Sequence, residues 1–223
     1  MTEKSSIDPI NKTATFRLAQ TDMCKGYANG SIGIIVSGLI WLISATISYQ
    51  YSAKQAVWTL LIGGMFIHPM GMLLSKVIGL SGTHTKGNPL GNLAMEGTIF
   101  MIMCLPLAFG LSLQHAEWFF QGMLLIIGGR YLTFSSIYGL KLYWILGAVL
   151  GVSAYLLFYF KVQSFGSLLT GSFIEISFGL SLFFSFRRET NYHKTPINVC
   201  RHMILSESNE IRGFLPHVSV FFL

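Results

Sequence analysis

Residues Ala28 to Tyr49 read ANGSIGIIVSGLIWLISATISY, and this stretch carries no charged side chain. A helix needs about 20 mostly apolar residues to cross the hydrocarbon core of a bilayer. The apolar residues here form a continuous run, whereas a strand of a membrane barrel would alternate apolar and polar positions. The stretch therefore predicts a membrane-spanning helix.

Five similar stretches follow along the chain. They cover Gln55–Val77, Leu93–Leu113, Glu117–Tyr138, Lys141–Phe160 and Ser164–Phe186. Only 11% of the residues are charged, against about 25% in soluble domains. Lipid offers no partner to an unpaired backbone N–H or C=O group, so such segments must be helical. We expect an all-α fold, a polytopic membrane helix bundle with six transmembrane helices.

The positions of the basic residues predict an orientation. The chain has 15 lysines and arginines, and only Lys54 and Lys161 lie in the first, third and fifth links. Arg130 lies inside a span, and all the others lie in the two tails or in the second and fourth links. Because basic residues collect on the cytoplasmic side, we expect both termini to be cytoplasmic. The expected organisation is an N-terminal tail (1–27), a transmembrane domain (28–186) and a C-terminal tail (187–223).

The net charge of +6 is explained by this bias, so nucleic acid is not an expected partner. Cys24, Cys104 and Cys200 show no metal-ligand spacing, and we expect neither a metal site nor a cofactor. No zinc-protease motif, nucleophile elbow or phosphate-binding loop occurs in the sequence. An enzymatic activity therefore has no nucleophile and base that can be named, and the question stays open.

Three polar residues stand inside the apolar stretches: His68, Arg130 and Glu175. An ionisable group at the centre of a membrane helix costs roughly 2.5–3.5 kcal/mol on insertion scales. Such a group usually has a partner and often a function. In the expected topology all three lie at a similar depth, on helices that run in the same direction. The simplest interpretation is a buried ion pair between Arg130 and Glu175, with His68 as a third member.

Small residues support an inward position for two of the three. Ser167, Gly171, Glu175 and Gly179 recur at steps of four, which places them on one face of a helix. A second stripe consists of Gly64, His68, Gly71 and Ser75. Small residues allow membrane helices to approach closely, so both faces are expected to point into the bundle. Pro69 should bend the helix beside His68.

Two further patterns are weaker. Asn88, Asn92 and Glu96 also recur at steps of four, and they could line a cytoplasmic vestibule. Gly147 and Gly151 form a close-packing motif, which serves either a homodimer or packing within the chain. With Gly171 and Gly179 they are the expected helix-packing glycines.

One segment resembles a known family. The stretch from Gly129-Arg130-Tyr131-Leu132-Thr133-Phe134 to Ile137-Tyr138-Gly139-Leu140-Lys141 is similar to a family of small bacterial inner-membrane proteins that carries only a domain-of-unknown-function label. Gly63-Gly64-Met65 and Ser37-Gly38-Leu39-Ile40-Trp41 share the likeness, which covers roughly Tyr27 to Phe186. The resemblance implies a multi-pass protein of a bacterial inner membrane. It assigns no activity and no catalytic residues.

Two functions are favoured at this point, ahead of an intramembrane enzyme. One is transport of a small solute, an ion or a proton through a centre formed by His68, Arg130 and Glu175. The other is a non-catalytic membrane protein that acts by assembly or by binding a partner. In that case the same residues only fix the packing of the helices.

Overall fold

The computed structural model describes the backbone of residues 9–192 and the side chains of residues 13–188. This part is helical, and it contains no strand. The elements are α1 (Pro9–Tyr27), η1 (Ala28–Gly30), α2 (Ser31–Gln50), α3 (Ala53–Val77), α4 (Pro89–Ser112), α5 (Ala116–Tyr138), α6 (Leu142–Tyr159) and α7 (Ser164–Tyr192). The expected all-α bundle is confirmed.

The six expected spans correspond to α2 through α7. Five helices of the described chain are long and apolar enough to cross a membrane, with α1 and α2 counted together as Thr13–Gln50. The exception is α5, which has 23 residues but carries Glu117, Gln121 and Arg130 within its length. It packs between α4 and α6. The orientation of the termini stays a prediction.

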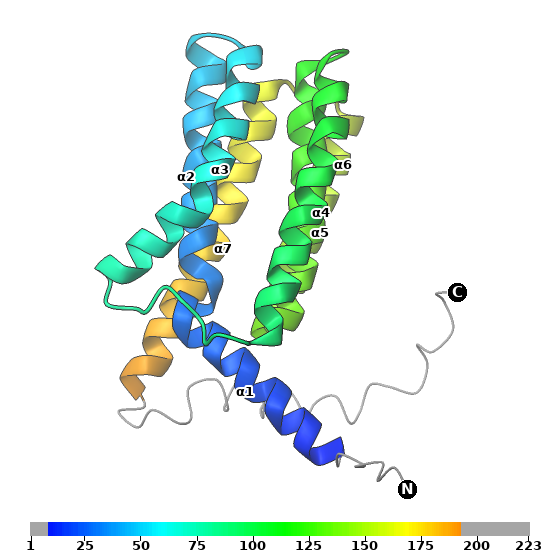
Figure 1. Ribbon diagram of the computed structural model, residues 1–223. Helices are drawn as coiled ribbons and strands as arrows, with labels where there is room; N and C mark the ends of the chain where they lie inside the picture. The colour runs from blue at the N-terminus through cyan, green and yellow to red at the C-terminus, as the bar shows by residue number, and fades with distance from the viewer. Residues whose placement is uncertain (1–8, 193–223) are drawn as a thin grey trace, which may run out of the picture.

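The long helices form two groups of three, which Figure 1 shows side by side. One group contains α2, α3 and α7, in which α2 packs along both of the others. The second group contains α4, α5 and α6, in which α5 packs along both of the others. The two groups touch less extensively, mainly where α5 and α6 meet α7 and where α3 meets α5. A side chain on α5 or α7 can therefore lie at the junction of the groups.

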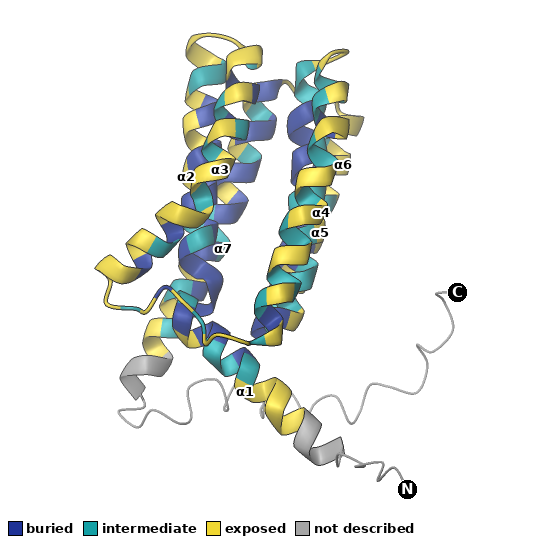
Figure 2. Ribbon diagram, in the orientation of Figure 1, coloured by how far each residue is buried: buried dark blue, intermediate teal, exposed yellow. Residues whose placement is uncertain are grey.

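The core follows the central helices of this arrangement. Trp41, Phe119, Phe120 and Tyr143 are its largest fully buried apolar side chains. Figure 2 shows α3 and α4 with few buried residues. Only 11% and 6% of their most apolar stretches are buried, against 44% for α7. The apolar outer faces of α3 and α4 match what a lipid environment requires.

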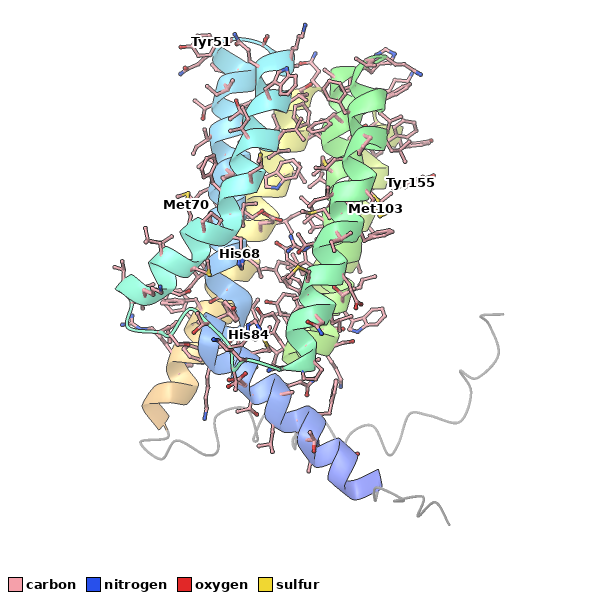
Figure 3. All side chains as sticks on the ribbon, viewed as in Figure 1. Tyr51, His68, Met70, His84, Met103 and Tyr155 are labelled. Carbon is pink, nitrogen blue, oxygen red and sulfur yellow. The ribbon has the colours of Figure 1, made fainter. Side chains whose placement is uncertain are left out.

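Helix α3 is bent near its middle. Pro69 lies inside the helix, where it lacks a backbone donor and crowds the carbonyl group of Met65. Figure 1 shows the bend, and Figure 3 places His68 and Met70 beside it. Just beyond the bend, Gly71 of α3 lies close to Gly33 of α2. The sequence expectation of a bend beside His68 is confirmed.

A short left-handed segment separates α1 from α2. Ala28, Asn29 and Gly30 have φ angles of 48°, 57° and 77°. Such angles are unfavourable for residues with a Cβ atom, so the surrounding contacts must hold them. The hydroxyl group of Tyr143 on α6 donates to the carbonyl oxygen of Asn29 at 2.5 Å. A Cβ atom on Gly30 would collide with Tyr138 and Tyr143, so the close approach needs glycine.

Within the expected N-terminal tail, α1 is anchored to the link between α3 and α4. The carboxylate of Asp22 accepts hydrogen bonds from the backbone N–H and the hydroxyl group of Thr85, both at 2.9 Å. The Asn88 side chain also donates to it, at 2.8 Å. A further bond, at 3.0 Å, joins the Tyr27 hydroxyl group to His84 Nδ1. These bonds hold the N-terminal end of α4 in place.

Candidate functional site: a buried carboxylate between two helix groups

Glu175 lies at the centre of the bundle on α7. The whole expected stripe of Ser167, Gly171, Glu175 and Gly179 is buried, and Glu175 itself is 0% exposed. The glycines explain the close packing on α2, because a Cβ atom on Gly171 would meet Trp41 at 2.9 Å. A Cβ atom on Gly179 would meet Ile35 at 2.7 Å.

The carboxylate has one firm hydrogen-bond donor. Tyr131 on α5, itself 5% exposed, donates its hydroxyl hydrogen to Glu175 Oε1 at 3.0 Å. Ser37 on α2 lies next to the carboxylate, but Oε2 has no partner with ordinary hydrogen-bond geometry in the described chain. A buried carboxylate that is only half satisfied is costly, and a functional role is one explanation for such a group.

Arg130 precedes Tyr131 but faces α4. Its Nη2 donates to Thr98 Oγ1 at 3.0 Å, and its Nη1 approaches the sulfur atom of Met101 at 3.6 Å. The guanidinium carbon also lies 5.2 Å from the centre of the Phe134 ring, which is within range of a cation–π interaction. The Nε atom is buried and has no partner in the described chain.

The expected ion pair between Arg130 and Glu175 is therefore not formed, since no ion pair in the described chain joins them. Consecutive residues on a helix point about 100° apart, because one turn takes 3.6 residues. When Tyr131 points at α7, its neighbour Arg130 must point elsewhere. The tyrosine, and not the arginine, contacts the carboxylate.

His68 lies apart from the other two residues. It is exposed on α3, at the bend shown in Figure 3, and no described hydrogen bond or ion pair joins it to Arg130 or Glu175. Its stripe divides at the bend, because Gly64 and His68 are exposed while Gly71 and Ser75 are buried. Pro69 accounts for the difference, since it changes the direction of the helix between the two halves of the stripe.

Aromatic rings surround the tyrosine that holds the carboxylate. Tyr131 packs against Phe134 and Tyr143, with ring centres 5.6 and 6.0 Å apart. Tyr138 stacks on Tyr143 at 5.4 Å. This cluster joins α5 to α6 and, through the bond from Tyr143 to Asn29, to the left-handed segment before α2. Tyr131 is thus held in place on several sides.

The expected vestibule residues differ in their contacts. Asn88 caps α4 by accepting from the Leu90 N–H at 3.0 Å, and it donates to the carbonyl group of Ala19 and to Asp22. Asn92 and Glu96 are exposed. A vestibule lined by these three residues stays a prediction.

The glycines of α6 pack within the chain. A Cβ atom on Gly147 would lie 2.7 Å from the carbonyl oxygen of Gly128 on α5. Gly151 faces the same helix, and its Cβ atom would meet Leu125 at 3.8 Å. The sequence left open whether Gly147 and Gly151 serve a homodimer or packing within the chain. In the structure they pack against α5 of the same chain. Among the described residues, no group of three His, Cys, Asp or Glu side chains is placed to hold a metal ion.

A comparison with known protein families agrees with the resemblance to a family of unknown function. A family of unknown function, DUF7010, matches residues 16–185. The chain belongs to this family. The matched segment includes both Tyr131 and Glu175, but the family description assigns neither an activity nor a ligand. Neither the curated proteins nor the solved structures compared with the chain gave a match.

Sequence reasoning missed Tyr131, Thr98 and Ser37 as parts of the site. Tyrosine is common near membrane interfaces, and serine and threonine often bond to their own helix. The available signal was the pair Arg130-Tyr131 itself. Two neighbouring polar-tipped residues inside one span face different directions, so Tyr131 must have a partner other than that of Arg130.

Proposed function

We propose that the protein is a membrane transporter for a small solute or ion and that Glu175 carries a proton during its cycle. The observation that supports this proposal most directly is a fully buried carboxylate whose Oε2 atom, although Ser37 lies beside it, has no hydrogen bond of ordinary geometry in the described chain. A charged carboxylate in this position is unfavourable, and uptake of a proton removes the charge. Intramembrane carboxylates that gain and lose protons are common in transporters.

The position of the carboxylate is consistent with such a role. Glu175 belongs to the group of α2, α3 and α7, while its donor Tyr131 belongs to the group of α4, α5 and α6. Transporters commonly bind their cargo between two halves that move against each other. A change of protonation at Glu175 would alter the bond between the two groups. In this way a proton could bias their relative position.

Arg130 and His68 have separate roles in the proposal. Arg130 places a positive charge beside Tyr131, so it can interact electrostatically with a nearby carboxylate without contacting it. His68 is exposed on α3, and we propose that it delivers or releases protons, because a histidine side chain can act as a proton shuttle. The setting that we propose is a bacterial inner membrane, as the sequence resemblance implies.

The proposal can be tested in proteoliposomes that contain a pH-sensitive dye. A potassium gradient with valinomycin sets a membrane potential, and proton entry is followed by fluorescence. Entry should be faster than in empty liposomes, and Glu175→Gln should abolish the difference. The matched control is Glu117→Gln, which changes a carboxylate near the start of α5 that is close to His115 instead. Normal proton entry through a folded Glu175→Gln protein would refute the proposal.

A second function, assembly or partner binding without transport, is favoured by a different observation. The contacts of Tyr131 and Arg130 join α5 to α7 and to α4, so these residues could serve packing alone. In that case the wild-type protein would conduct no protons, and Glu175→Gln would change only its thermal stability. A homodimer would need a surface other than Gly147 and Gly151, because these glycines face α5 of the same chain.

A further inference from the structure

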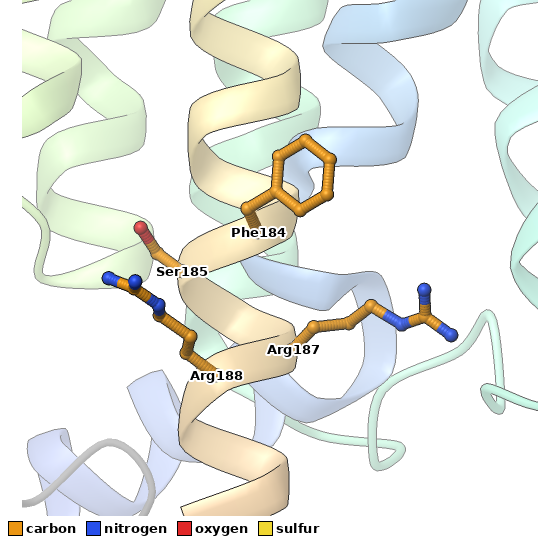
Figure 4. Close-up of a pocket in the computed structure, with 4 residues that line it drawn as sticks. All are labelled: Phe184, Ser185, Arg187 and Arg188. Carbon is orange, nitrogen blue, oxygen red and sulfur yellow. The ribbon is translucent and has the colours of Figure 1, made fainter.

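Near its C-terminal end, α7 carries a surface hollow of about 430 Å³. Phe184, Ser185, Arg187 and Arg188 line it (Figure 4). These residues come at the end of the segment Ser164–Arg188 that is apolar enough to cross a membrane. The hollow thus lies where the apolar part of α7 gives way to charged residues. Membrane proteins meet lipid headgroups at this level.

Both arginines are available to a ligand. They are exposed, and no ion pair in the described chain involves either of them. Arg187 lies over the ring of Phe183, 5.7 Å from its centre. Figure 4 shows Arg188 on the same side of the helix as Ser185 and Arg187 extending to the opposite side. A guanidinium group binds phosphate through two parallel hydrogen bonds. The hollow therefore offers positive charge and a hydroxyl group to a phosphate.

An apolar stripe leads to the arginines along α7. Phe173, Leu180 and Phe184 are 75%, 41% and 59% exposed. Their spacings of seven and four residues place them on one side of the helix, and Arg188 follows four residues after Phe184. An acyl chain could lie along this stripe while its headgroup reaches the arginines. A small soluble phosphate would leave the stripe unused.

We propose that this end of α7 is a binding site for a phospholipid with an anionic headgroup. Arg188 binds the phosphate, Ser185 donates a hydrogen bond to it, and the stripe from Phe173 to Phe184 holds an acyl chain. Arg187, on the other side of the helix, adds a second positive charge at the same level. The site is separate from Glu175 and does not depend on transport. Ser185 and the apolar stripe lie within the segment that matches the family, and Arg187 and Arg188 lie just beyond it.

The test uses the full-length protein in detergent and measures lipid binding by native mass spectrometry. The probes are dioleoyl phosphatidylglycerol and dioleoyl phosphatidylcholine, with glycerol 1-phosphate as a soluble competitor. The test variant is the double substitution Arg187→Gln and Arg188→Gln. The control is Lys54→Gln with Lys161→Gln, which removes two exposed charges at the other ends of the helices. Each protein is first shown by gel filtration to be folded and monodisperse.

The wild-type protein should prefer phosphatidylglycerol to phosphatidylcholine. The arginine variant should bind phosphatidylglycerol on the order of 10- to 30-fold more weakly, and the lysine control should bind like the wild type. Replacing both arginines by lysine should give an affinity between those of the wild type and the glutamine variant. The positive charge remains, but the planar guanidinium group that forms two parallel hydrogen bonds is lost. Equal loss in the lysine control, or unchanged binding by the arginine variant, would overturn the proposal. Full displacement of the lipid by glycerol 1-phosphate would identify a soluble phosphate ligand and overturn it as well.

Discussion

The hydroxyl group of Tyr131 donates a hydrogen bond to Glu175 Oε1 at 3.0 Å, and this bond joins α5 of one helix group to α7 of the other. Both residues are almost fully buried. In such surroundings the donor cannot be replaced by bulk water, so the bond contributes to specificity as well as stability. It is the contact through which the state of the carboxylate could influence the arrangement of the two groups.

Tyr131→Phe removes the donor and keeps the ring in the aromatic cluster. The buried carboxylate then loses its one firm partner, so we expect a loss of stability of about 1–3 kcal/mol. The measurement is thermal unfolding in detergent, followed by the fluorescence of a thiol-reactive dye. Tyr155→Phe is the control, because Tyr155 is 66% exposed on α6 and should tolerate the change. An equal shift in both variants would mean that the bond to Glu175 contributes nothing of its own.

The burial pattern of α7 could be predicted from the sequence, and the partner of Glu175 could not. Steps of four residues correctly placed Ser167, Gly171, Glu175 and Gly179 on one buried face, since the helix is regular over that length. The partner depends on how α5 is rotated about its axis. That rotation is set by contacts such as Gly128 against Gly147, which no local pattern in α5 reveals.

The position of His68 shows a second limit of prediction from the sequence. The sequence correctly predicted a bend at Pro69, but the stripe of small residues was extended through the bend as if the helix were straight. A kink changes the direction of the helix axis and of the side chains beyond it. Residues spaced four apart therefore share one face only when they lie on the same side of the kink. Similarly, α1 looked like a polar tail because its contacts with Thr85 and Asn88 come from a distant link.

Thr98→Val tests the contact that holds Arg130 against α4. Valine keeps the branched shape of threonine but cannot accept the hydrogen bond from Arg130 Nη2. A partly buried guanidinium group then loses an acceptor, and we expect a decrease in stability of about 1–3 kcal/mol. Thermal unfolding of the purified protein again provides the measurement.

Thr59→Val is the matched control for this change. The hydroxyl groups of Thr98 and Thr59 both bond to the carbonyl group four residues earlier, at 2.9 Å in each case. Only Thr98 also accepts from Arg130. The difference between the two variants therefore isolates the contribution of the arginine. If the two melting temperatures fall equally, the contact between Arg130 and Thr98 does not stabilise the protein.

Gly147→Ala tests the packing of α5 on α6. The added methyl group would lie 2.7 Å from the carbonyl oxygen of Gly128 and 2.8 Å from Leu132. Because a backbone atom cannot rotate away as a side chain can, the helices must separate, and we expect a loss of about 1–3 kcal/mol. Gly151→Ala is the control within the same motif, since its methyl group would make an ordinary contact with Leu125 at 3.8 Å. That variant should be neutral or more stable by up to about 1 kcal/mol, because alanine favours helix. If both glycines instead served a homodimer, each substitution would shift the protein from dimer to monomer, which gel filtration with light scattering would detect.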